Sequence, residues 1–267
     1  MNFVNKLLNL FNIYFRKSKI LLSKPIGDKN KYREIFLKAK QFKIQNLENL
    51  LKEENILIEN DWFNDLAFKT QIVIKKSDIN YYHGKLLYFY LSKYLNKNQH
   101  DAITILETGT ARGYSSICMS KALNDNKVNG KIYTIDILPN NTKMYWNCID
   151  DHDGKKTRFE LLSPWEKELK NIIFIEGNTK KKLKTIDLKR INFAFLDAAH
   201  TFKDVIYEFN FVSKLQKSGD IIFFDDYSPN IFNPVVKAIN EIEKQNTYKF
   251  KKILATKQRG YAIAYKI

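Results

Sequence analysis

The sequence has 267 residues, and its 45 Lys and Arg against 29 Asp and Glu give a formal net charge of +16. A chain of this length can bury the core of one large α/β domain together with an N-terminal extension. Its two cysteines provide neither a disulfide framework nor a metal-binding cluster, and no apolar run reaches the roughly 20 residues of a membrane span.

The positive charge bears on the partners and the location that we expect. An excess of basic residues can mark binding to nucleic acid or to an anionic membrane. The basic residues here are mostly Lys scattered over the whole length, which favours a solvated surface. No small-residue cleavage site follows a hydrophobic N-terminus, so we see no secretory signal and expect a cytoplasmic protein. We also expect a homo-oligomer.

The N-terminal part of the sequence is predicted to be helical. Residues 1–24 carry apolar residues at roughly helical spacing, flanked by basic residues. This pattern favours a helix packed on its own domain or on a partner subunit, and peripheral membrane contact through residues 1–24 is the alternative. After a break that contains Pro and Gly, further helices are predicted over residues 31–53 and 61–68, and another over residues 81–95.

The most informative stretch is residues 103–123. An apolar strand ends on Glu107, and a loop containing Gly109 and Gly113 leads into an apolar-periodic helix. The glycines let the backbone approach a ligand closely, and the start of the helix offers free N–H groups and a positive dipole end. This strand–loop–helix unit predicts a cradle for a nucleotide-like cofactor.

The loop differs from the dinucleotide fingerprint Gly-x-Gly-x-x-Gly. Its spacing is Glu107-x-Gly109-x-x-x-Gly113, so a carboxylate leads the loop. A carboxylate at this place would repel a pyrophosphate, but it suits a cofactor that carries an ammonium or sulfonium group.

The residues Glu-Thr-Gly-Thr-Ala-Arg-Gly-Tyr-Ser at 107–115 resemble the first motif of S-adenosylmethionine-dependent methyltransferases, and more narrowly that of the catechol and caffeoyl-CoA O-methyltransferases. The resemblance covers residues 80–267. We therefore expect a helical extension over residues 1–75 and a methyltransferase domain over residues 76–267. The resemblance implies that these residues of the loop hold the cofactor: Glu107, Gly109, Thr110, Gly113 and Ser115.

Two further strands extend this unit. Residues 131–137 are predicted to be a strand that carries Asp136 near its end, where a carboxylate can accept both ribose hydroxyls of a nucleoside. The resembled methyltransferases have an acidic residue at the matching place, although an aspartate that only caps a turn is the alternative. Residues 171–176 are predicted to be the next strand, and the resemblance places the residues after it at the adenine ring: Gly177, Asn178 and Thr179.

The connection over residues 138–170 is longer than a simple helical connection. Its mixture of aromatic and charged residues predicts a lid or a substrate-recognition segment. It contains three aspartates around His152, which could mimic a metal cluster. Adjacent positions cannot all converge on one ion, so we favour a solvated turn.

Two apolar strands nearer the C-terminus also end on carboxylates. Residues 191–197 end on Asp197, and residues 219–226 end on Asp225 and Asp226. Because ligands bind at the C-terminal ends of strands in an open parallel sheet, these aspartates predict three oxygen ligands for Mg²⁺. The resembled metal-dependent enzymes have one Asp followed later by Asp-Asn or Asp-Asp, and the Asp-Asp form is most similar to the macrocin-type sugar O-methyltransferases.

His200 follows Asp197 by three residues, at the place where catechol-type enzymes carry a catalytic Lys. A histidine whose pKa is near its ordinary value of about 6.5 can accept a hydroxyl proton at neutral pH. We therefore predict His200 and Asp197 as catalytic residues. A loop histidine that caps the following helix, predicted over residues 204–215, is the alternative.

The C-terminal part completes the expected fold. A helix is predicted over residues 234–243, and two strands over residues 248–255 and 261–267 are joined by a tight turn. Together with the resemblance, these elements predict an α/β protein with a Rossmann-like class I methyltransferase fold. We expect a mostly parallel seven-stranded sheet with an antiparallel C-terminal hairpin.

The predicted reaction is methyl transfer from S-adenosylmethionine to a hydroxyl oxygen of a small molecule, assisted by Mg²⁺. A sugar or polysaccharide unit is the preferred acceptor because of the Asp-Asp resemblance. Three alternatives remain open: a nucleic-acid methyltransferase, suggested by the net charge; a methyltransferase-like protein that binds a partner without turnover; and an iron- and oxoglutarate-dependent enzyme of the cephalosporin-hydroxylase type, which shares the Asp-x-x-His pattern.

Overall fold

The computed structural model describes residues 24–97 and 102–267. Except for its last position, the helix predicted over residues 1–24 lies outside the described residues. Among the helices of the described segments, none has the length and apolar composition needed to cross a membrane.

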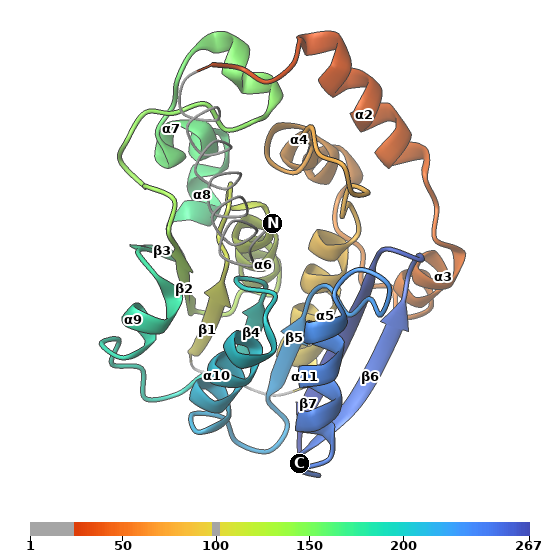
Figure 1. Ribbon diagram of the computed structural model, residues 1–267, viewed down its shortest axis with the longest axis vertical. Helices are drawn as coiled ribbons and strands as arrows, with labels where there is room; N and C mark the ends of the chain where they lie inside the picture. Colours follow the sequence, from red (N-terminus) through yellow and green to blue (C-terminus); the bar gives the residue numbers. More distant parts are fainter. Residues whose placement is uncertain (1–23, 98–101) are drawn as a thin grey trace, which may run out of the picture.

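A seven-stranded sheet forms the centre of the molecule, with the strand order β3-β2-β1-β4-β5-β7-β6 (Figure 1). Neighbouring strands from β3 to β5 pair in parallel, and β7 pairs antiparallel with both β5 and β6. The predicted parallel sheet with an antiparallel C-terminal hairpin is therefore confirmed. The strands are β1 Ile103–Thr108, β2 Gly130–Asp136, β3 Ile172–Glu176, β4 Phe193–Leu196, β5 Ile221–Phe224, β6 Tyr248–Leu254 and β7 Gly260–Lys266.

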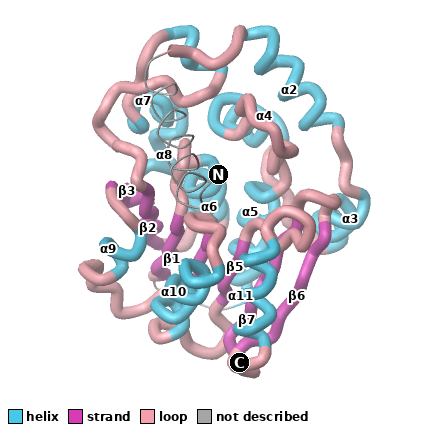
Figure 2. Tube along the Cα trace, viewed as in Figure 1, coloured by secondary structure: helices cyan, strands magenta, loops and turns pink. Residues whose placement is uncertain are grey.

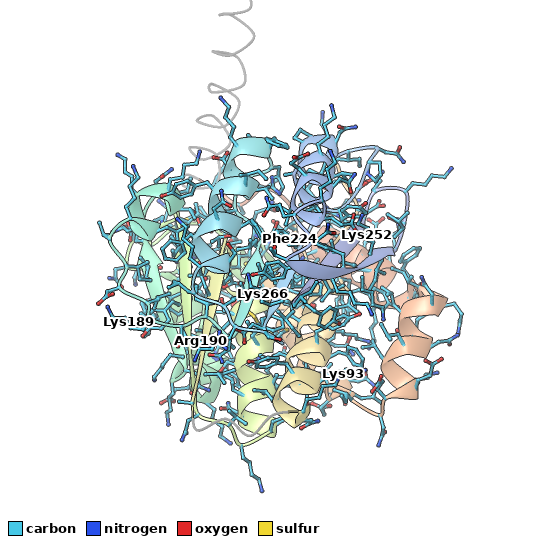
Figure 3. All side chains as sticks on the ribbon, turned by 90° about the horizontal axis from the view of Figure 1, so that it is seen from below. Lys93, Lys189, Arg190, Phe224, Lys252 and Lys266 are labelled. Atoms are coloured by element: carbon cyan, nitrogen blue, oxygen red, sulfur yellow. The ribbon has the colours of Figure 1, made fainter. Side chains whose placement is uncertain are left out.

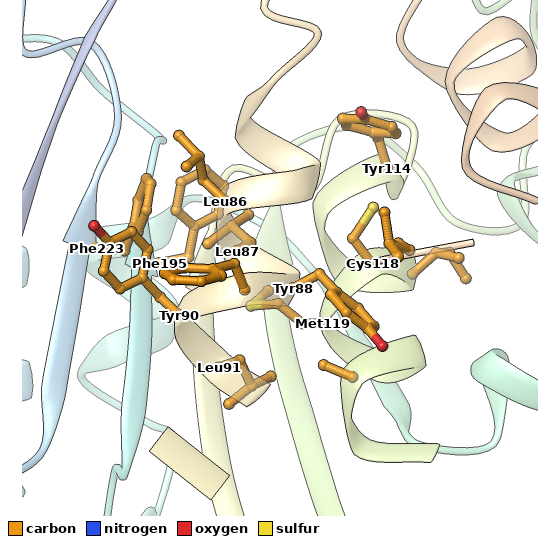
Figure 4. Packing of buried hydrophobic residues seen from close by; sticks show 14 of the residues in the cluster. Leu86, Leu87, Tyr88, Tyr90, Leu91, Tyr114, Cys118, Met119, Phe195 and Phe223 are labelled. Carbon is orange, nitrogen blue, oxygen red and sulfur yellow. The ribbon is translucent and has the colours of Figure 1, made fainter. Parts of the chain in front are cut away.

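Alternating side chains of the strands fill two hydrophobic layers, because successive residues of a strand point to opposite faces. In β4, Phe193 and Phe195 pack in the first layer, whereas Ala194 and Leu196 pack in the second. Figure 4 shows the first layer, where Phe195 and Phe223 of neighbouring strands lie beside Tyr90 of a helix. Such strands, buried on both faces, have the near-continuous apolar runs seen in the sequence.

Helices cover both faces of the sheet. The first layer packs under α5 His83–Lys97 and α6 Tyr114–Asp125, and Cys118 of α6 is fully buried there. The second layer packs under α9 Thr179–Leu183, α10 Phe202–Ser213 and α11 Asn233–Glu243.

The predicted helix over residues 31–53 is wrong, because the structure has two helices there. These are α2 Lys29–Gln41 and α3 Gln45–Glu53, separated by extended backbone at Phe42 and Ile44. No Pro or Gly marks this break. A tertiary contact stabilises it instead, since the Ile44 N–H donates to the hydroxyl of Tyr82 at 3.2 Å and that hydroxyl donates to Glu48 at 2.8 Å.

The helix predicted at residues 61–68 is confirmed as α4 Asn60–Thr70, whose first turn is capped by the side chain of Glu59. Helices α2, α3 and α4 contribute side chains to the first hydrophobic layer. Residues 24–75 therefore pack on the same core as the sheet, and the division of the chain at residue 75 stays a prediction.

The connection between β2 and β3 is largely loop, as Figure 2 shows. It contains the short helices η1 Ile149–Asp153, α7 Arg158–Leu162, η2 Ser163–Trp165 and α8 Glu166–Leu169. Met144, Trp146, Cys148 and Leu161 form a small hydrophobic cluster within it. The acidic run around His152 forms the η1 turn, where the buried Asp151 carboxylate accepts the backbone N–H of Trp146 at 2.7 Å.

Basic side chains are carried by elements on different sides of the molecule. Figure 3 labels Lys93 of α5, Lys189 in the loop before β4, Lys252 of β6 and Lys266 of β7. This arrangement agrees with the scattered distribution of Lys in the sequence.

Candidate active site

The loop after β1 passes close to the end of β4. Gly109 has a positive φ of 91°, and a Cβ at this position would lie 2.2 Å from the backbone oxygen of Asp197. Gly113 also has a positive φ, of 88°, at the N-cap of α6. Both positions favour glycine because L side chains rarely adopt this conformation. The close approach of the two segments brings the β1 loop and Asp197 to one rim of the sheet.

Glu107 is fully buried and connects three elements rather than facing a ligand. The hydroxyls of Ser115, Ser116 and Thr134 all donate to its carboxylate. Burial raises the pKa of Glu107 to about 7, and the hydroxyl donors act in the opposite direction. Glu107, a predicted cofactor residue, therefore joins β1 to β2 and α6 through hydrogen bonds and supports the start of the loop.

Asp136 lies at the end of β2 against the same loop. Its Oδ2 accepts the Ala111 N–H at 2.7 Å, and its Oδ1 accepts the Leu138 N–H at 2.8 Å. The backbone oxygen of Asp136 accepts the Gly177 N–H at 2.7 Å, so the turn after β3 adjoins it. Asn178 then caps α9, accepting the Lys181 N–H at 3.2 Å. Asp136 and the turn that contains Gly177, Asn178 and Thr179 thus lie side by side.

A cleft of about 310 Å³ lies at the C-terminal ends of β1, β4 and β5. Helix α4 and the segment after it line the cleft from the N-terminal side through Thr70, Gln71 and Lys75. The predicted site residues that line it are Gly109, Thr110, Ser115, Asp197, His200, Asp225 and Asp226. The structure therefore brings one end of the cofactor loop and all four predicted catalytic and metal-binding residues together.

Three side chains in the cleft could hold a cation. One ligand atom each of Asp197, His200 and Asp226 lies within 4.8 Å of the others. The His200 Nε2 is 2.9 Å from Asp226 Oδ2 and 3.5 Å from Asp197 Oδ1. Asp226 has a positive φ of 56°, which is uncommon for a residue other than glycine. The backbone therefore adopts a strained conformation at the residue that contacts His200.

Asp225 is directed differently from the other two aspartates. Its Oδ2 accepts the side-chain amide of Asn80 at 2.7 Å, and its Oδ1 accepts the backbone N–H of Asp226 at 2.8 Å. Burial and the nearby charges of Asp197 and Asp226 raise the pKa of Asp225 well above its ordinary value. The trio that the structure brings together thus contains His200 in place of the predicted Asp225.

Sequence reasoning missed the partners of these carboxylates. Arg259, in the turn before β7, donates from Nη1 to Asp226 Oδ1 at 2.5 Å and from Nη2 to the backbone oxygen of Asp78 at 2.9 Å. Tyr261 donates to Asn80 Oδ1 at 2.5 Å. The sequence contains no local signal for these contacts, since the partners come from segments far apart in the chain.

Among the basic groups that line the cleft, His200 and Lys75 have pKa values shifted in opposite directions. Burial by itself would lower the pKa of His200, but its hydrogen bonds to Asp197 and Asp226 and their negative charges outweigh that effect and raise it to about 10. Desolvation in the cleft and the charge of Arg259 lower the pKa of Lys75 to about 8, against the opposite effect of Asp225 and Asp226.

Arg158 joins the segment between β2 and β3 to the cofactor loop through hydrogen bonds. Its side chain is fully buried, stacks over Trp146 and donates to the backbone oxygens of Ala111 at 3.2 Å and Leu138 at 3.3 Å. The connection therefore supports the loop from outside. Its predicted role as a lid or a recognition segment stays a prediction.

The sequence over residues 106–227 matches a family model described as a methyltransferase domain. A comparison with curated protein sequences found no match.

Solved structures show the same fold at low sequence identity. The O-methyltransferase TomG of Streptomyces achromogenes, involved in tomaymycin synthesis and solved with S-adenosylmethionine, is 17% identical, with a TM-score of 0.55 over 85% of this chain and 99% of that chain. An O-methyltransferase of Bacillus cereus, solved with S-adenosylhomocysteine, is 14% identical, with a TM-score of 0.54 over 84% of this chain and 98% of that chain. The predicted class I methyltransferase fold is confirmed.

Proposed function

Because the chain carries a methyltransferase domain over residues 106–227 in a class I methyltransferase fold, we propose that it transfers a methyl group from S-adenosylmethionine to a hydroxyl oxygen of a small molecule. The observation that carries this proposal is the cleft itself. The glycine loop after β1 and the cluster of Asp197, His200 and Asp226 line one space of about 310 Å³. A methyl donor and an acceptor hydroxyl must meet in such a space for direct transfer.

The residues of the loop fit a nucleoside cofactor. When bound, S-adenosylmethionine supplies a methyl group on a positively charged sulfur, which a nucleophilic oxygen can displace. Gly109 lets the loop pack directly against the backbone of Asp197, and Gly109 and Thr110 line the cleft. The Asp136 carboxylate, held by the N–H groups of Ala111 and Leu138, is the proposed acceptor of the ribose hydroxyls. The turn at Gly177, Asn178 and Thr179 is the proposed border of the adenine ring.

We propose that Glu107 supports this site without contacting the cofactor. Its carboxylate accepts three hydroxyl groups from β2 and α6 and is fully buried. These bonds fix the angle at which the loop leaves β1. Tyr114 and Ser115, the first residues of α6, line the cleft, so the positive end of this helix lies beside it.

The acidic cluster fits a divalent cation. Carboxylate oxygens suit Mg²⁺ or Mn²⁺, and an imidazole nitrogen is also a common metal ligand. When bound, such an ion lowers the pKa of a hydroxyl that coordinates it. Asp197 and Asp226 are the proposed ligands, with His200 beside them. Asp225, which does not belong to the close group of Asp197, His200 and Asp226, is instead proposed to hold Asn80 and the backbone of Asp226 in place.

His200 is the proposed group that takes the hydroxyl proton. With its pKa raised to about 10, the imidazole keeps a proton as long as the charges of Asp197 and Asp226 are not neutralised. The imidazole must lose this proton before it can accept the proton of the acceptor hydroxyl. Charge compensation at the two aspartates is therefore a requirement for His200 to act as a base.

A sugar or polysaccharide unit is supported by the resemblance of the Asp225-Asp226 pair to sugar O-methyltransferases. The iron- and oxoglutarate-dependent alternative has less support, because non-haem iron oxygenases of that type use two histidines and one carboxylate. The described cluster has one histidine and two carboxylates.

Titration calorimetry with S-adenosylhomocysteine tests the proposal directly. We expect saturable binding of one molecule per chain, competed by S-adenosylmethionine. Methyl transfer from radiolabelled S-adenosylmethionine to a panel of hydroxylated small molecules then tests turnover. Absence of any binding would contradict the cofactor assignment, and binding without transfer to any hydroxyl would favour the non-catalytic alternative.

A further inference from the structure

A second cavity adjoins the cleft on its N-terminal side. Its volume is about 350 Å³, within the range of roughly 300–1,000 Å³ that small-molecule sites have. It shares four lining residues with the cleft, namely Val73, Lys75, Asn80 and Arg259. A molecule in this cavity would therefore reach the cluster of Asp197, His200 and Asp226.

The walls of this cavity come from outside residues 106–227, the part that matches the methyltransferase domain. Helix α2, the break after it and the segment between α4 and α5 supply most of the lining, and the turn before β7 and the start of β7 supply the rest. Most of the lining side chains are apolar or aromatic, among them Ile35, Phe42, Ile44, Val73, Tyr82 and Tyr261. Helix α2 and the segments around residues 42–44 and 73–82 thus enclose a mainly apolar space next to the proposed site of chemistry.

The cavity also contains Lys75, an exposed basic residue whose charge interacts with those of Asp225 and Asp226. Lys75 makes no hydrogen bond or ion pair within the described segments, whereas Lys38 of the same cavity pairs with Glu34 at 2.6 Å and Arg259 pairs with Asp226. Lys75 lines both the cavity and the cleft. Its ammonium group is therefore available to a ligand that spans the two.

We propose that the cavity holds the body of the methyl acceptor, an apolar group of about two fused rings that carries a carboxylate or similar anion paired with Lys75. The acceptor hydroxyl on this molecule faces Asp197, His200 and Asp226. This inference rests on the proposed function and names the substrate class of the same site. It also assigns a role to the N-terminal helices, which build the acceptor side of the site.

The lining distinguishes this class from a free sugar. An apolar ligand is stabilised by the apolar surface that it buries. A sugar in the same place would bury hydroxyls against Ile35, Phe42 and Val73, and a hydroxyl buried without a hydrogen-bond partner is unfavourable. We therefore place an apolar body in this cavity instead of the sugar unit that the Asp225-Asp226 resemblance suggests.

Fluorescence titration with 3-hydroxy-2-naphthoate tests the proposal, because this compound carries a hydroxyl, an apolar body and a carboxylate. It is titrated into the full chain saturated with S-adenosylhomocysteine. We expect it to bind at least about tenfold more tightly than naphthol, which lacks the carboxylate, and than glucuronate, which lacks the apolar body; tenfold corresponds to about 1.4 kcal/mol. Equal affinity for all three compounds, or tighter binding of glucuronate, would overturn the proposal.

Two pairs of variants locate the binding. Phe42 and Leu37 are both 54% exposed, but only Phe42 lines the cavity. Phe42→Ala should weaken binding of the naphthoate at least about fivefold, and Leu37→Ala should not. Likewise, Lys75→Gln should remove the preference for the naphthoate over naphthol, whereas Lys76→Gln, on a neighbour that does not line the cavity, should keep it. Equal effects within either pair would contradict the placement.

The experiment separates this inference from the proposed function. Binding of S-adenosylhomocysteine is measured first, on the same protein without naphthoate. Normal cofactor binding together with no preference for the naphthoate would overturn the acceptor class alone. Failure to bind the cofactor would overturn the proposed function, and the naphthoate titration on the cofactor-free chain would still decide what the cavity binds.

Discussion

The two halves of the proposed site are built in different ways. In the cofactor half, Glu107, Gly109, Gly113 and Asp136 belong to one β–α–β unit, and their contacts join neighbouring elements. In the acidic half, Asp226 depends on Arg259, and Asp225 depends on Asn80, which lies 145 residues away in the chain.

This difference predicts two kinds of mutational effect. Changes in the cofactor half should alter cofactor affinity and leave the fold intact, because the backbone forms most of that site. Changes in the acidic half should affect turnover and stability together, because buried charges that lose a partner are costly. The predictions below test this contrast, from the largest expected effect to the smallest.

Removal of divalent cations tests the acidic half most severely. We expect EDTA to reduce methyl transfer to background and Mg²⁺ in excess to restore it, because Asp197 and Asp226 are the proposed ligands. Affinity for S-adenosylhomocysteine, measured in the same solutions, should not change. Full turnover in EDTA would rule out the metal role of the two aspartates.

Arg259→Gln should destabilise the fold. Arg259 is 7% exposed and Asp226 is 4% exposed, so the substitution leaves a buried carboxylate without its main partner. We expect the free energy of unfolding, measured with denaturant, to fall by about 3 kcal/mol. The double variant Arg259→Gln/Asp226→Asn should recover part of that loss. Lys189→Gln, which breaks an exposed pair with Asp187, is the matched control and should leave stability unchanged.

His200→Gln should reduce kcat by about 100-fold, since a positioned acid–base group contributes at least that much. The glutamine keeps a similar size and polarity, so cofactor affinity should remain as in the parent chain. His152→Gln serves as the control because His152 lies in the η1 turn outside the cleft. If the His200 variant keeps the kcat of the parent chain, His200 has no role in proton transfer and acts only as a structural partner of Asp226.

Asp136→Ala should weaken binding of S-adenosylhomocysteine by about tenfold, corresponding to the loss of hydrogen bonds to a charged group. The unfolding free energy should change little, because Asp136 is only partly buried and its partners are backbone N–H groups at the rim. Asp187→Ala, on the surface, is the control. Unchanged affinity in calorimetry would remove Asp136 from the ribose site.

Local sequence patterns determined the strands and the cofactor loop. Apolar runs that end on Glu107, Asp136, Asp197 and Asp225 indicated buried parallel strands, and the structure places each run in the sheet. The positive φ of Gly109 and of Gly113 agrees with the turn that the glycine spacing predicted. Such features are predictable because continuous apolar runs and glycine conformation involve only residues close together in the chain.

The break between α2 and α3 could not be predicted in the same way. The sequence over residues 31–53 keeps a helical pattern without Pro or Gly, yet the chain is extended at Phe42 and Ile44. The hydroxyl of Tyr82 accepts the Ile44 N–H there. The interaction that overrides local propensity comes from a residue 38 positions away.

The sequence by itself determined the class of fold, the cofactor loop and the set of acidic residues at one rim of the sheet. Only the tertiary structure decided how those acids are used: Asp226 meets His200 and Arg259, Asp225 turns to Asn80, and Lys75 joins the cleft to a cavity under α2. The physical reason is the range of the forces involved. Strand and turn preferences act between near neighbours, whereas the compensation of buried charge depends on whichever segments the fold brings within a few ångströms.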